Sequence, residues 1–550
     1  MTTLRQAEVA GALSLATDLA MGQQLEHGLR TAIIALRLAR AIGLSEDEQV
    51  TVYYTGLLHF AGCTAESEID ARFFGDELAA RARMLPVQFG TRLNLMATMM
   101  RVVHSGSTPL ARAAVMARSA FTGVSEFHKW AASHCDVARM LGARMGLSEQ
   151  AQVALRHLYE RWDGNGMPGE MRGTAIPVAV RVTHVAQDAD VAWQYGGTAF
   201  ASRVLTEHSG SGLDPDAVRS ALSLGQDLYA DLDAPSVWTH AIDMEPGPRP
   251  LVTGNRLNTC LSAIADFADL KSRWMIGHSR GVARLAAAAG LTAGLSAAQV
   301  RQLHQAGLVH DIGRVTVPVS VWAKPGPLTR DDWERVRLHA YHSERVLTVA
   351  AGLRPLASLA GAHGERCDGS GYHRGSRDED LPPGAWLLAA ADCYYAMREQ
   401  RPHRPALDAK AAAAALRGEA AAGRLPDDAV AAVLTVTGQD ARTDSGPTTD
   451  SGLTADSGPT TDSWPTTDSW LAEETEPAAA GQPPRPAGLS ERECEVLGLI
   501  ARGMATKQVA RQLGISPKTC DHHIQHMYRK IGSSTRAGAT LFALEHGLIG

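Results

Sequence analysis

The chain has 550 residues, of which 45% are hydrophobic and 20% charged, and a formal net charge of −6. This length allows three or four domains with packed cores. No apolar stretch reaches the ~20 residues of a membrane span, and the N-terminus lacks the basic start and apolar core of a signal peptide. The seven cysteines are scattered without a CxxC spacing, which suits a reducing compartment. We therefore expect a cytoplasmic protein with no membrane partner.

Helical periodicity dominates the sequence. The segments 26–44 and 277–295 both repeat apolar residues at helical spacing and both end at Gly-Leu. Alanine-rich runs in the second half also favour helix, and the alternation typical of strands is scarce. The sequence therefore predicts an all-α fold.

An internal repeat organises the first 437 residues. Matching positions keep equal separations in the two halves: 32 residues for His27/His59 and His278/His310, and 24 for His134/Leu158, His339/His363, Asp163/Gln187 and Asp368/Asp392. A repeat this regular predicts two copies of one domain. We place them at 1–200 and 271–437, joined by a helical connector at 201–270.

The first copy has lost its carboxylates. Phe60 and Gln187 stand where the second copy has Asp311 and Asp392, so we expect a degenerate site without metal, in which His27, His59 and His134 are ordinary hydrogen-bonded histidines. Between His59 and His134 the first copy also carries 46 more residues than the second copy does between His310 and His339. We expect this insertion, within about 64–125, to form extra helices, and we assign it no ligand.

The second copy has the residues of a metal site. His310 and Asp311 are adjacent at the end of an apolar helix, where both side chains can turn toward one cation and the carboxylate can bridge a second. Imidazoles mixed with carboxylates suit divalent ions such as Fe, Mn, Zn or Co. Two such ions about 3.5–4 Å apart can clamp a phosphate and activate a water.

Three motifs contain or follow that pair. They are "LVHDIGRV" at 308–315, "KPGPLT" at 324–329 and "HGERCDGSGYHRG" at 363–375. Together with His339 they resemble the HD-GYP family of HD-superfamily phosphohydrolases, well over 274–405 and more weakly over 23–200.

This resemblance implies a cofactor, a substrate class and a set of site residues. The cofactor would be one or two divalent transition metals such as Fe or Mn, and the substrate a cyclic dinucleotide or other phosphorylated small molecule. The first ion would be held by His278, His310, Asp311 and Asp392. Asp311 would bridge to a second ion held by His339 and His363, and Asp311 and Arg314 would be the catalytic residues.

Four positions depart from the family pattern. Gly364 replaces the second histidine of the "HHE" triplet, Arg314 replaces a lysine, His373 replaces the proline of "GYP", and Trp274 replaces a glutamate of some members. The first metal position is therefore complete and the second is one ligand short, unless His373 supplies it. Two functions stay open: a metal-dependent phosphodiesterase, or a non-catalytic sensor and dimerisation platform.

A low-complexity segment follows the second copy. From Asp444 the chain repeats units such as DSGPTT every six residues. Short polar units with Pro and Gly bury too little surface to fold, so we predict a disordered linker at 438–487.

The C-terminal segment 488–550 has the pattern of a helix-turn-helix. Ser490 and Glu493 form a capping-box signature, Gly514 marks a tight turn, and Ser516 can cap the following helix. The segment resembles the LuxR-type DNA-binding domain. The complete fold prediction is thus all-α: two tandem HD-type domains, a linker and a four-helix LuxR-type domain.

Charge and motif indicate duplex DNA as the partner of this segment. It has eight Lys/Arg and five Asp/Glu, or +3, which leaves −9 for the remainder. The resemblance places Lys507, Lys518, Thr519, His523 and Lys530 near DNA, and Cys520 and Asp521 stand where the family has valine and lysine. The final helix, about 534–547, has a small apolar face (Ala537, Leu541 and Leu544) suited to pairing, so we expect a homodimer. The sequence therefore predicts a transcriptional regulator.

Overall fold

The computed structural model describes residues 3–65, 67–84, 101, 128–439 and 485–549. The described chain is helical apart from one two-stranded antiparallel pair, β1 (Leu4–Arg5) with β2 (Leu251–Val252). The predicted all-α class is confirmed. Most of the predicted linker, residues 440–484, lies outside the described residues. No described helix is long and apolar enough to cross a membrane.

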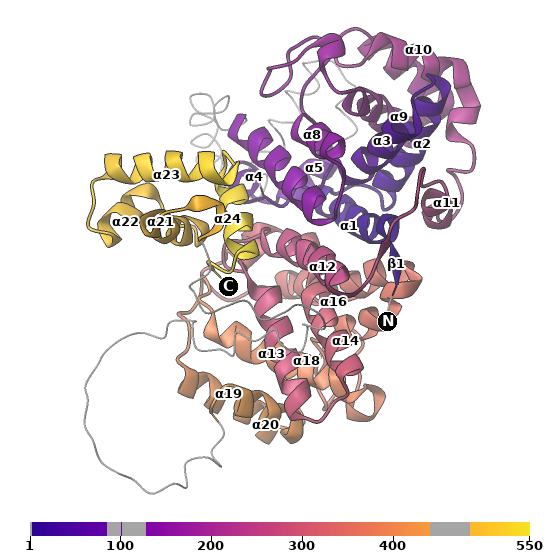
Figure 1. Ribbon diagram of the computed structural model, residues 1–550. Helices are drawn as coiled ribbons and strands as arrows, with labels where there is room; N and C mark the ends of the chain where they lie inside the picture. Colours follow the sequence, from indigo (N-terminus) through magenta and orange to yellow (C-terminus); the bar gives the residue numbers. More distant parts are fainter. Residues whose placement is uncertain (1–2, 66, 85–100, 102–127, 440–484, 550) are drawn as a thin grey trace, which may run out of the picture.

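The first copy occupies the indigo-to-purple part of Figure 1. Its helices are α1 (Gln6–Met21), α2 (His27–Ala41), α3 (Glu46–Leu58), α4 (Ser67–Phe74), α5 (Glu77–Met84), a helix over 128–144, α8 (Glu149–Arg156) and α9 (Val178–His208). The connecting region contains α10 (Pro215–Leu224), α11 (Trp238–Asp243) and α12 (Gly254–Asp269). The α4–α5 hairpin supplies two of the extra helices expected in the insertion, whose residues 85–100 and 102–127 lie outside the described part.

The second copy fills the pink-to-orange part of Figure 1. Its helices are α13 (His278–Thr292), α14 (Ala297–Val309), α15 (Val319–Trp322), α16 (Arg330–Val349), α17 (Arg354–Gly361), α18 (Pro383–Arg398), α19 (Ala409–Ala421) and α20 (Asp427–Val436). Short 3₁₀ turns occur at Gly173–Ala175, Gly225–Tyr229, Ile312–Thr316, Ala351–Leu353, Asp378–Asp380 and Pro486–Gly488.

Local sequence signals explain why the two copies begin alike. Ser45 caps α3 and Ser296 caps α14, each within a complete capping box. Asp18 accepts a hydrogen bond from the amide of Gly28, the second residue of α2, and Asp269 does the same for the amide of Ser279, the second residue of α13. The trio α12–α13–α14 thus repeats α1–α2–α3, so the repeat includes α12, which lies in the region predicted as the connector. The copies pack together partly through α1, which contacts α16 and the turn that follows Asp311.

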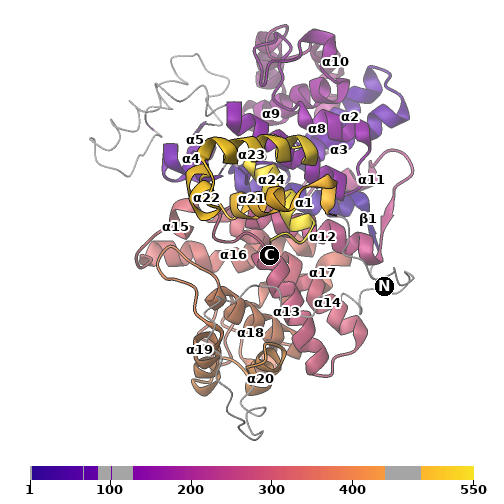
Figure 2. The same ribbon diagram turned by 60° about the vertical axis from the view of Figure 1, so that its left-hand side comes forward.

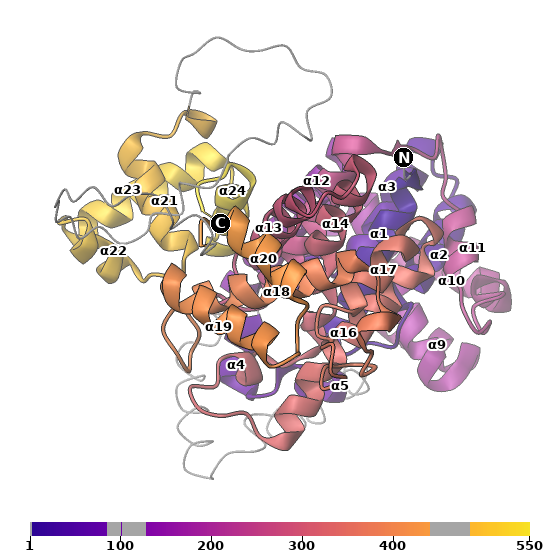
Figure 3. The same cartoon turned by 90° about the horizontal axis from the view of Figure 1, so that it is seen from below.

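The C-terminal domain is a four-helix unit, drawn in yellow in Figure 3. Its helices are α21 (Glu491–Ala501), α22 (Thr506–Gln512), α23 (Pro517–Ile531) and α24 (Arg536–Glu545). Ser490 and Glu493 form the predicted capping box, and Ser516 caps α23 through the Thr519 amide (3.0 Å). Gly514 takes the left-handed conformation (φ 64°) at the turn between α22 and α23, which glycine tolerates without steric cost.

This domain rests on the first copy and the connector (Figure 2). Asp136 accepts hydrogen bonds from the Ser533 hydroxyl (2.7 Å) and the Thr535 hydroxyl (3.0 Å). Arg144 donates to the Leu541 carbonyl (2.7 Å) and pairs with buried Asp266. Leu541 and Leu544 of the apolar face predicted for pairing are buried, and α24 packs against α21 of the same domain. The homodimer stays a prediction.

Candidate metal centre and DNA-binding face

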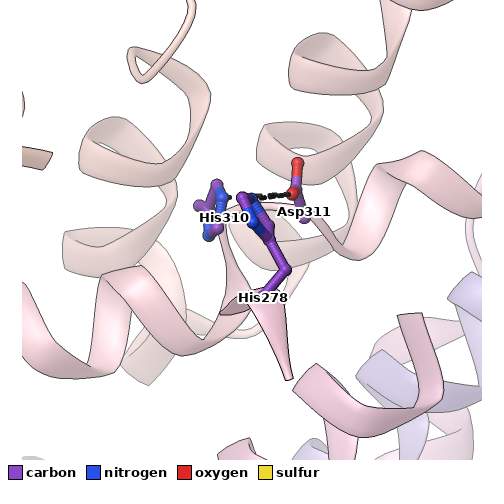
Figure 4. A group of neighbouring side chains, drawn as sticks. All are labelled: His278, His310 and Asp311. Atoms are coloured by element: carbon purple, nitrogen blue, oxygen red, sulfur yellow. Dashed lines mark ion pairs between the residues drawn. The ribbon is translucent and has the colours of Figure 1, made fainter. Parts of the chain in front are cut away.

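Six side chains of the second copy converge at the junction of its helices. His278 is the first residue of α13, His310 and Asp311 directly follow α14, His339 lies in α16, His363 follows α17, and Asp392 lies in α18. We call these six residues the histidine–aspartate cluster. Figure 4 shows three of them, with the imidazoles of His278 and His310 turned toward Asp311. The structure thus brings together all six residues predicted as metal ligands.

Asp311 occupies the centre of the cluster and is fully buried. Its Oδ2 atom lies 3.4 Å from His278 Nε2 and 3.1 Å from His310 Nε2. Its Oδ1 atom lies 3.4 Å from His339 Nε2 and 3.7 Å from His363 Nε2. Each oxygen therefore faces a different pair of imidazoles, which is the arrangement of a carboxylate shared between two cation positions.

Asp392 adds a second carboxylate on one side only. Its Oδ1 atom is 3.1 Å from His278 Nε2 and 3.8 Å from His310 Nε2. The first position therefore has two histidines and two aspartates around it. The second has His339 and His363, whose Nε2 atoms are 2.8 Å apart, and the shared Asp311.

The ring orientations fit a metal ion. The Nδ1 atoms of His310 and His363 donate to the carbonyls of Gly307 (2.7 Å) and Ala360 (2.6 Å), and His339 donates to Val336 in the same way. Because a carbonyl only accepts, each Nδ1 carries the proton when the ring is neutral, and each Nε2 lone pair faces the cluster. Buried polar atoms usually have hydrogen-bond partners. For His310 Nε2 and the two Asp311 oxygens, no contact among the described residues has hydrogen-bond geometry, although Arg314 forms an ion pair with Oδ2.

The charge balance of the cluster also calls for a cation. Burial by itself would lower the pKa of His310, but Asp311 and Asp392 outweigh it and raise that pKa to about 9. Burial opposes a charged His278 as well, and Glu399, Asp311 and Asp392 hold its pKa well above the ordinary value. Burial and the neighbouring imidazoles lower the pKa of His363 to about 3. The carboxylates thus keep His278 and His310 protonated, and an ion bound between these rings would replace their Nε2 protons.

Glu399 is a residue that the sequence reasoning missed. Its Oε2 atom accepts from His278 Nδ1 (2.9 Å) and from Arg401 Nη2 (2.6 Å). A carboxylate on the far nitrogen of a metal-binding histidine fixes the ring and raises its basicity. Only its place at the end of α18, seven residues after Asp392, could have indicated this contact.

Arg314 lies beside the cluster. Its Nη1 atom is 2.7 Å from Asp311 Oδ2 and also contacts the sulfur of Met275 (2.9 Å). The guanidinium carbon lies 5.1 Å from the centre of the Trp322 ring. A planar guanidinium in this position presents a fixed positive charge next to the proposed ions.

Gly364 is explained by a neighbouring aromatic ring. A Cβ atom at this position would lie 2.4 Å from Cε2 of Tyr372, which is closer than side chains can approach. The Tyr372 amide also donates to the Gly364 carbonyl (3.0 Å) and holds the ring there. The tyrosine therefore fills the space that a side chain at 364 would need.

His373 does not join the cluster. Its Nε2 atom lies 3.3 Å from Glu344 Oε2, and it is absent from both groups of convergent metal donors among the described residues. Trp274 is not among these donors either, and its carbonyl accepts from Arg401 (2.9 Å). The second position therefore has three donor groups, and the option that His373 supplies a fourth gains no support.

The first copy keeps a buried polar cluster of a different kind. His27 pairs with Asp190 (2.6 Å), and Arg30 holds the other oxygen of the same carboxylate (2.8 Å). His134 Nε2 donates to the His59 carbonyl (3.0 Å), and Phe60 packs on the His59 ring. No three metal donors converge in the described part of this copy. Asp190, three residues after Gln187, was not foreseen.

The proposed DNA-contacting residues spread over the C-terminal domain. Lys507, Lys518 and Thr519 are exposed and His523 is half-exposed, with the last three on α23. Lys530 is already engaged: its ammonium donates to Glu493 (2.7 Å) and to the Gly488 carbonyl (3.0 Å). Cys520 is buried and Asp521 is exposed beside it. The start of α23 thus offers a polar, partly basic surface that the docked arrangement leaves open.

Comparisons with known proteins give matches for the second copy and for the C-terminal domain. Residues 262–427 match the family model described as HD domain, and residues 487–543 match that of bacterial regulatory proteins, luxR family. A Vibrio cholerae protein named 3'3'-cGAMP-specific phosphodiesterase 3 is 27% identical over 411 residues, which are 74% of this chain and 89% of that protein. The Xanthomonas campestris cyclic di-GMP phosphodiesterase response regulator RpfG is 36% identical over 156 residues, 28% of this chain and 41% of that protein.

The tandem arrangement also has a solved counterpart. The crystal structure of a cyclic GMP-AMP-specific phosphodiesterase of V. cholerae superposes with a TM-score of 0.55, covers 79% of this chain and 97% of its own, and is 23% identical. At this identity the likeness concerns the fold. The chain therefore joins an HD domain to a helix-turn-helix domain. The HD domain is related to the HD-GYP cyclic-dinucleotide phosphodiesterases, and the C-terminal domain is of the LuxR type.

Proposed function

We propose that the second copy is a metal-dependent phosphodiesterase for a cyclic dinucleotide and that the C-terminal domain binds duplex DNA. The chain would then be a transcriptional regulator linked to a nucleotide messenger. The observation that carries this proposal is the buried Asp311, whose two oxygens each face a separate pair of imidazole nitrogens. The relatives named above, whose names specify 3'3'-cGAMP or cyclic di-GMP, support the substrate class.

Each residue of the cluster has a role in this proposal. His278, His310, Asp311 and Asp392 would hold the first ion, and His339 and His363 would hold a second one together with Asp311. A pair of such ions polarises a phosphodiester and supplies a nucleophile from water at neutral pH. Arg314 would bind a phosphate oxygen and neutralise charge that develops on it.

The direct test combines metal analysis with hydrolysis. The full-length protein is purified, loaded with Mn²⁺ or Fe²⁺, and assayed on bis(p-nitrophenyl) phosphate, 3'3'-cGAMP and cyclic di-GMP. We expect bound metal and turnover of at least one cyclic dinucleotide. Metal binding without turnover of any of the three substrates would refute the enzymatic part.

One observation favours a second function. Arg314 is paired with Asp311, and Tyr372 fills the space next to Gly364, so the second ion position has three donor groups. A centre with one ion could bind a nucleotide without cleaving it and act as a sensor. Calorimetric binding of a cyclic dinucleotide that is recovered intact after incubation would favour this function over catalysis.

The DNA-binding part has its own test. Gel-shift titrations of the full-length protein on random duplex DNA at several salt concentrations should show affinity that falls with salt. Absence of salt-dependent binding would refute this part and leave the centre untouched.

A further inference from the structure

The α4–α5 hairpin of the first copy lies against the second copy. Glu68 accepts from the Arg273 amide (3.1 Å), and Asp76 pairs with Arg335 (2.8 Å). Both contacts are partly exposed. A third contact is different, because Glu77, the first residue of α5, is fully buried.

Glu77 joins two segments of the second copy. Its Oε1 atom lies 2.7 Å from the ammonium of Lys271, whose side chain is only 2% exposed. The same carboxylate accepts the Val319 amide at 3.1 and 3.3 Å. Burying two charges is costly unless their geometry is well satisfied, and such a pair often adds little net stability. We therefore consider which segments this buried carboxylate holds together.

The two segments that Glu77 holds flank Arg314. Lys271 is the first residue of the turn that contains Met275, and the Met275 sulfur contacts Arg314 Nη1 (2.9 Å). Val319 opens α15, which ends at Trp322. The Trp322 ring lies 5.1 Å from the Arg314 guanidinium carbon and 6.3 Å from the His339 ring. The Glu77 carboxylate thus contacts the first residue of each of the two segments that pack against Arg314.

We propose that Glu77 is a positioning residue for Arg314, supplied by the first copy to the active site of the second. This inference rests on the proposed function and assigns a task to the insertion that the first copy carries between His59 and His134. Without the carboxylate, the Val319 amide and the Lys271 ammonium are left buried without a partner, so α15 and the 271–275 turn loosen. The histidine–aspartate cluster is held by other helices and should keep its geometry.

The variants separate charge from hydrogen bonding. Because removing one member of a buried ion pair can unfold a protein, Lys271→Met is combined with each change at Glu77. Glu77→Gln with Lys271→Met keeps an oxygen that can accept the Val319 amide. Glu77→Leu with Lys271→Met removes that acceptor as well. The matched control is Asp76→Asn, which removes the exposed pair with Arg335 and keeps an oxygen for the Ala79 amide at the start of α5.

Two readouts are independent of turnover. Hydrogen–deuterium exchange, followed by mass spectrometry in the absence of added metal, reports on the peptide 317–324. Isothermal titration of the Mn²⁺-loaded protein with inorganic phosphate reports on the anion site beside Arg314. For the leucine double variant we expect faster exchange in this peptide and phosphate affinity weaker by about tenfold, the size of one lost charge-assisted hydrogen bond. Metal content should stay unchanged. The glutamine double variant and Asp76→Asn should stay within about threefold of the parent.

The outcomes are distinct. Parent-like exchange and phosphate affinity in the leucine double variant would overturn the positioning role. Loss of metal along with phosphate affinity would also overturn it, because the change would then be a general collapse of the site. If the parent hydrolyses no phosphodiester, the proposed function fails, while exchange and phosphate binding still decide on Glu77. Where turnover is present, the leucine double variant should raise KM for bis(p-nitrophenyl) phosphate more than it lowers kcat.

Discussion

Introducing a histidine at position 364 tests why the second ion position lacks a fourth donor group. From sequence alone, Gly364→His should raise the metal content toward two ions per chain. The structure changes that expectation, because a Cβ atom at 364 would lie 2.4 Å from one carbon of the Tyr372 ring and 2.8 Å from two others. The single variant must displace the ring before the imidazole can reach the ion.

The magnitude follows from the cost of overpacking. Forcing extra atoms into a filled site costs about 1–3 kcal/mol. For a domain of this size, each kcal/mol lowers the melting temperature by roughly 2–4 °C. We therefore expect Gly364→His to melt clearly below the parent with no gain in metal. Gly364→His combined with Tyr372→Ala removes the clash and should bind about one ion more than the parent.

The assay is elemental analysis by plasma mass spectrometry, together with differential scanning fluorimetry. Tyr372→Ala alone is the control, because it opens the space without adding a ligand. Parent-like melting and a second ion in the single variant would refute the steric argument. Two ions per chain in the parent would show that the second position is complete without any residue at 364.

Three other predictions concern the centre and the DNA-binding domain. Asp311→Ala should abolish both metal binding and hydrolysis, whereas His59→Ala should leave both near the parent; equal losses would contradict the assignment of the site to the second copy. Against the lowering effect of burial, Asp311 and Asp392 raise the pKa of His310 to about 9, and the pKa of His278 is held well above its ordinary value, so each Nε2 must lose a proton to bind the first ion. Mn²⁺ affinity should therefore rise by about tenfold per pH unit for each of the two protons between about pH 6 and 9; calorimetric affinity that is independent of pH would contradict this coupling. Lys518→Ala should weaken binding to every duplex and reduce the salt slope by about one, whereas Thr519→Ala should change sequence preference, both measured by gel shift; a sequence-selective effect of the lysine change would be evidence against a phosphate contact.

The repeat shows how far sequence reasoning could go. Apolar periodicity predicted the helices, and equal spacings between histidines predicted two copies of one domain. The capping boxes at Ser45 and Ser296 show the same helix start in both copies. The four-helix C-terminal domain was equally accessible, since its capping box and its turn at Gly514 are local. The boundaries between domains stay predictions, as do the residues assigned to metal binding, catalysis and DNA contact.

Other features depended on contacts between distant parts of the chain. Nothing local indicates that Glu399 turns back to His278, that Tyr372 occupies the space at Gly364, or that Glu77 of the first copy reaches Val319 of the second. The reason is physical: spacing and capping act within a few residues, and sequence pattern encodes them directly. Packing between helices decides which buried carboxylate meets which donor, so only the tertiary structure could show what surrounds the cluster that the sequence itself determined.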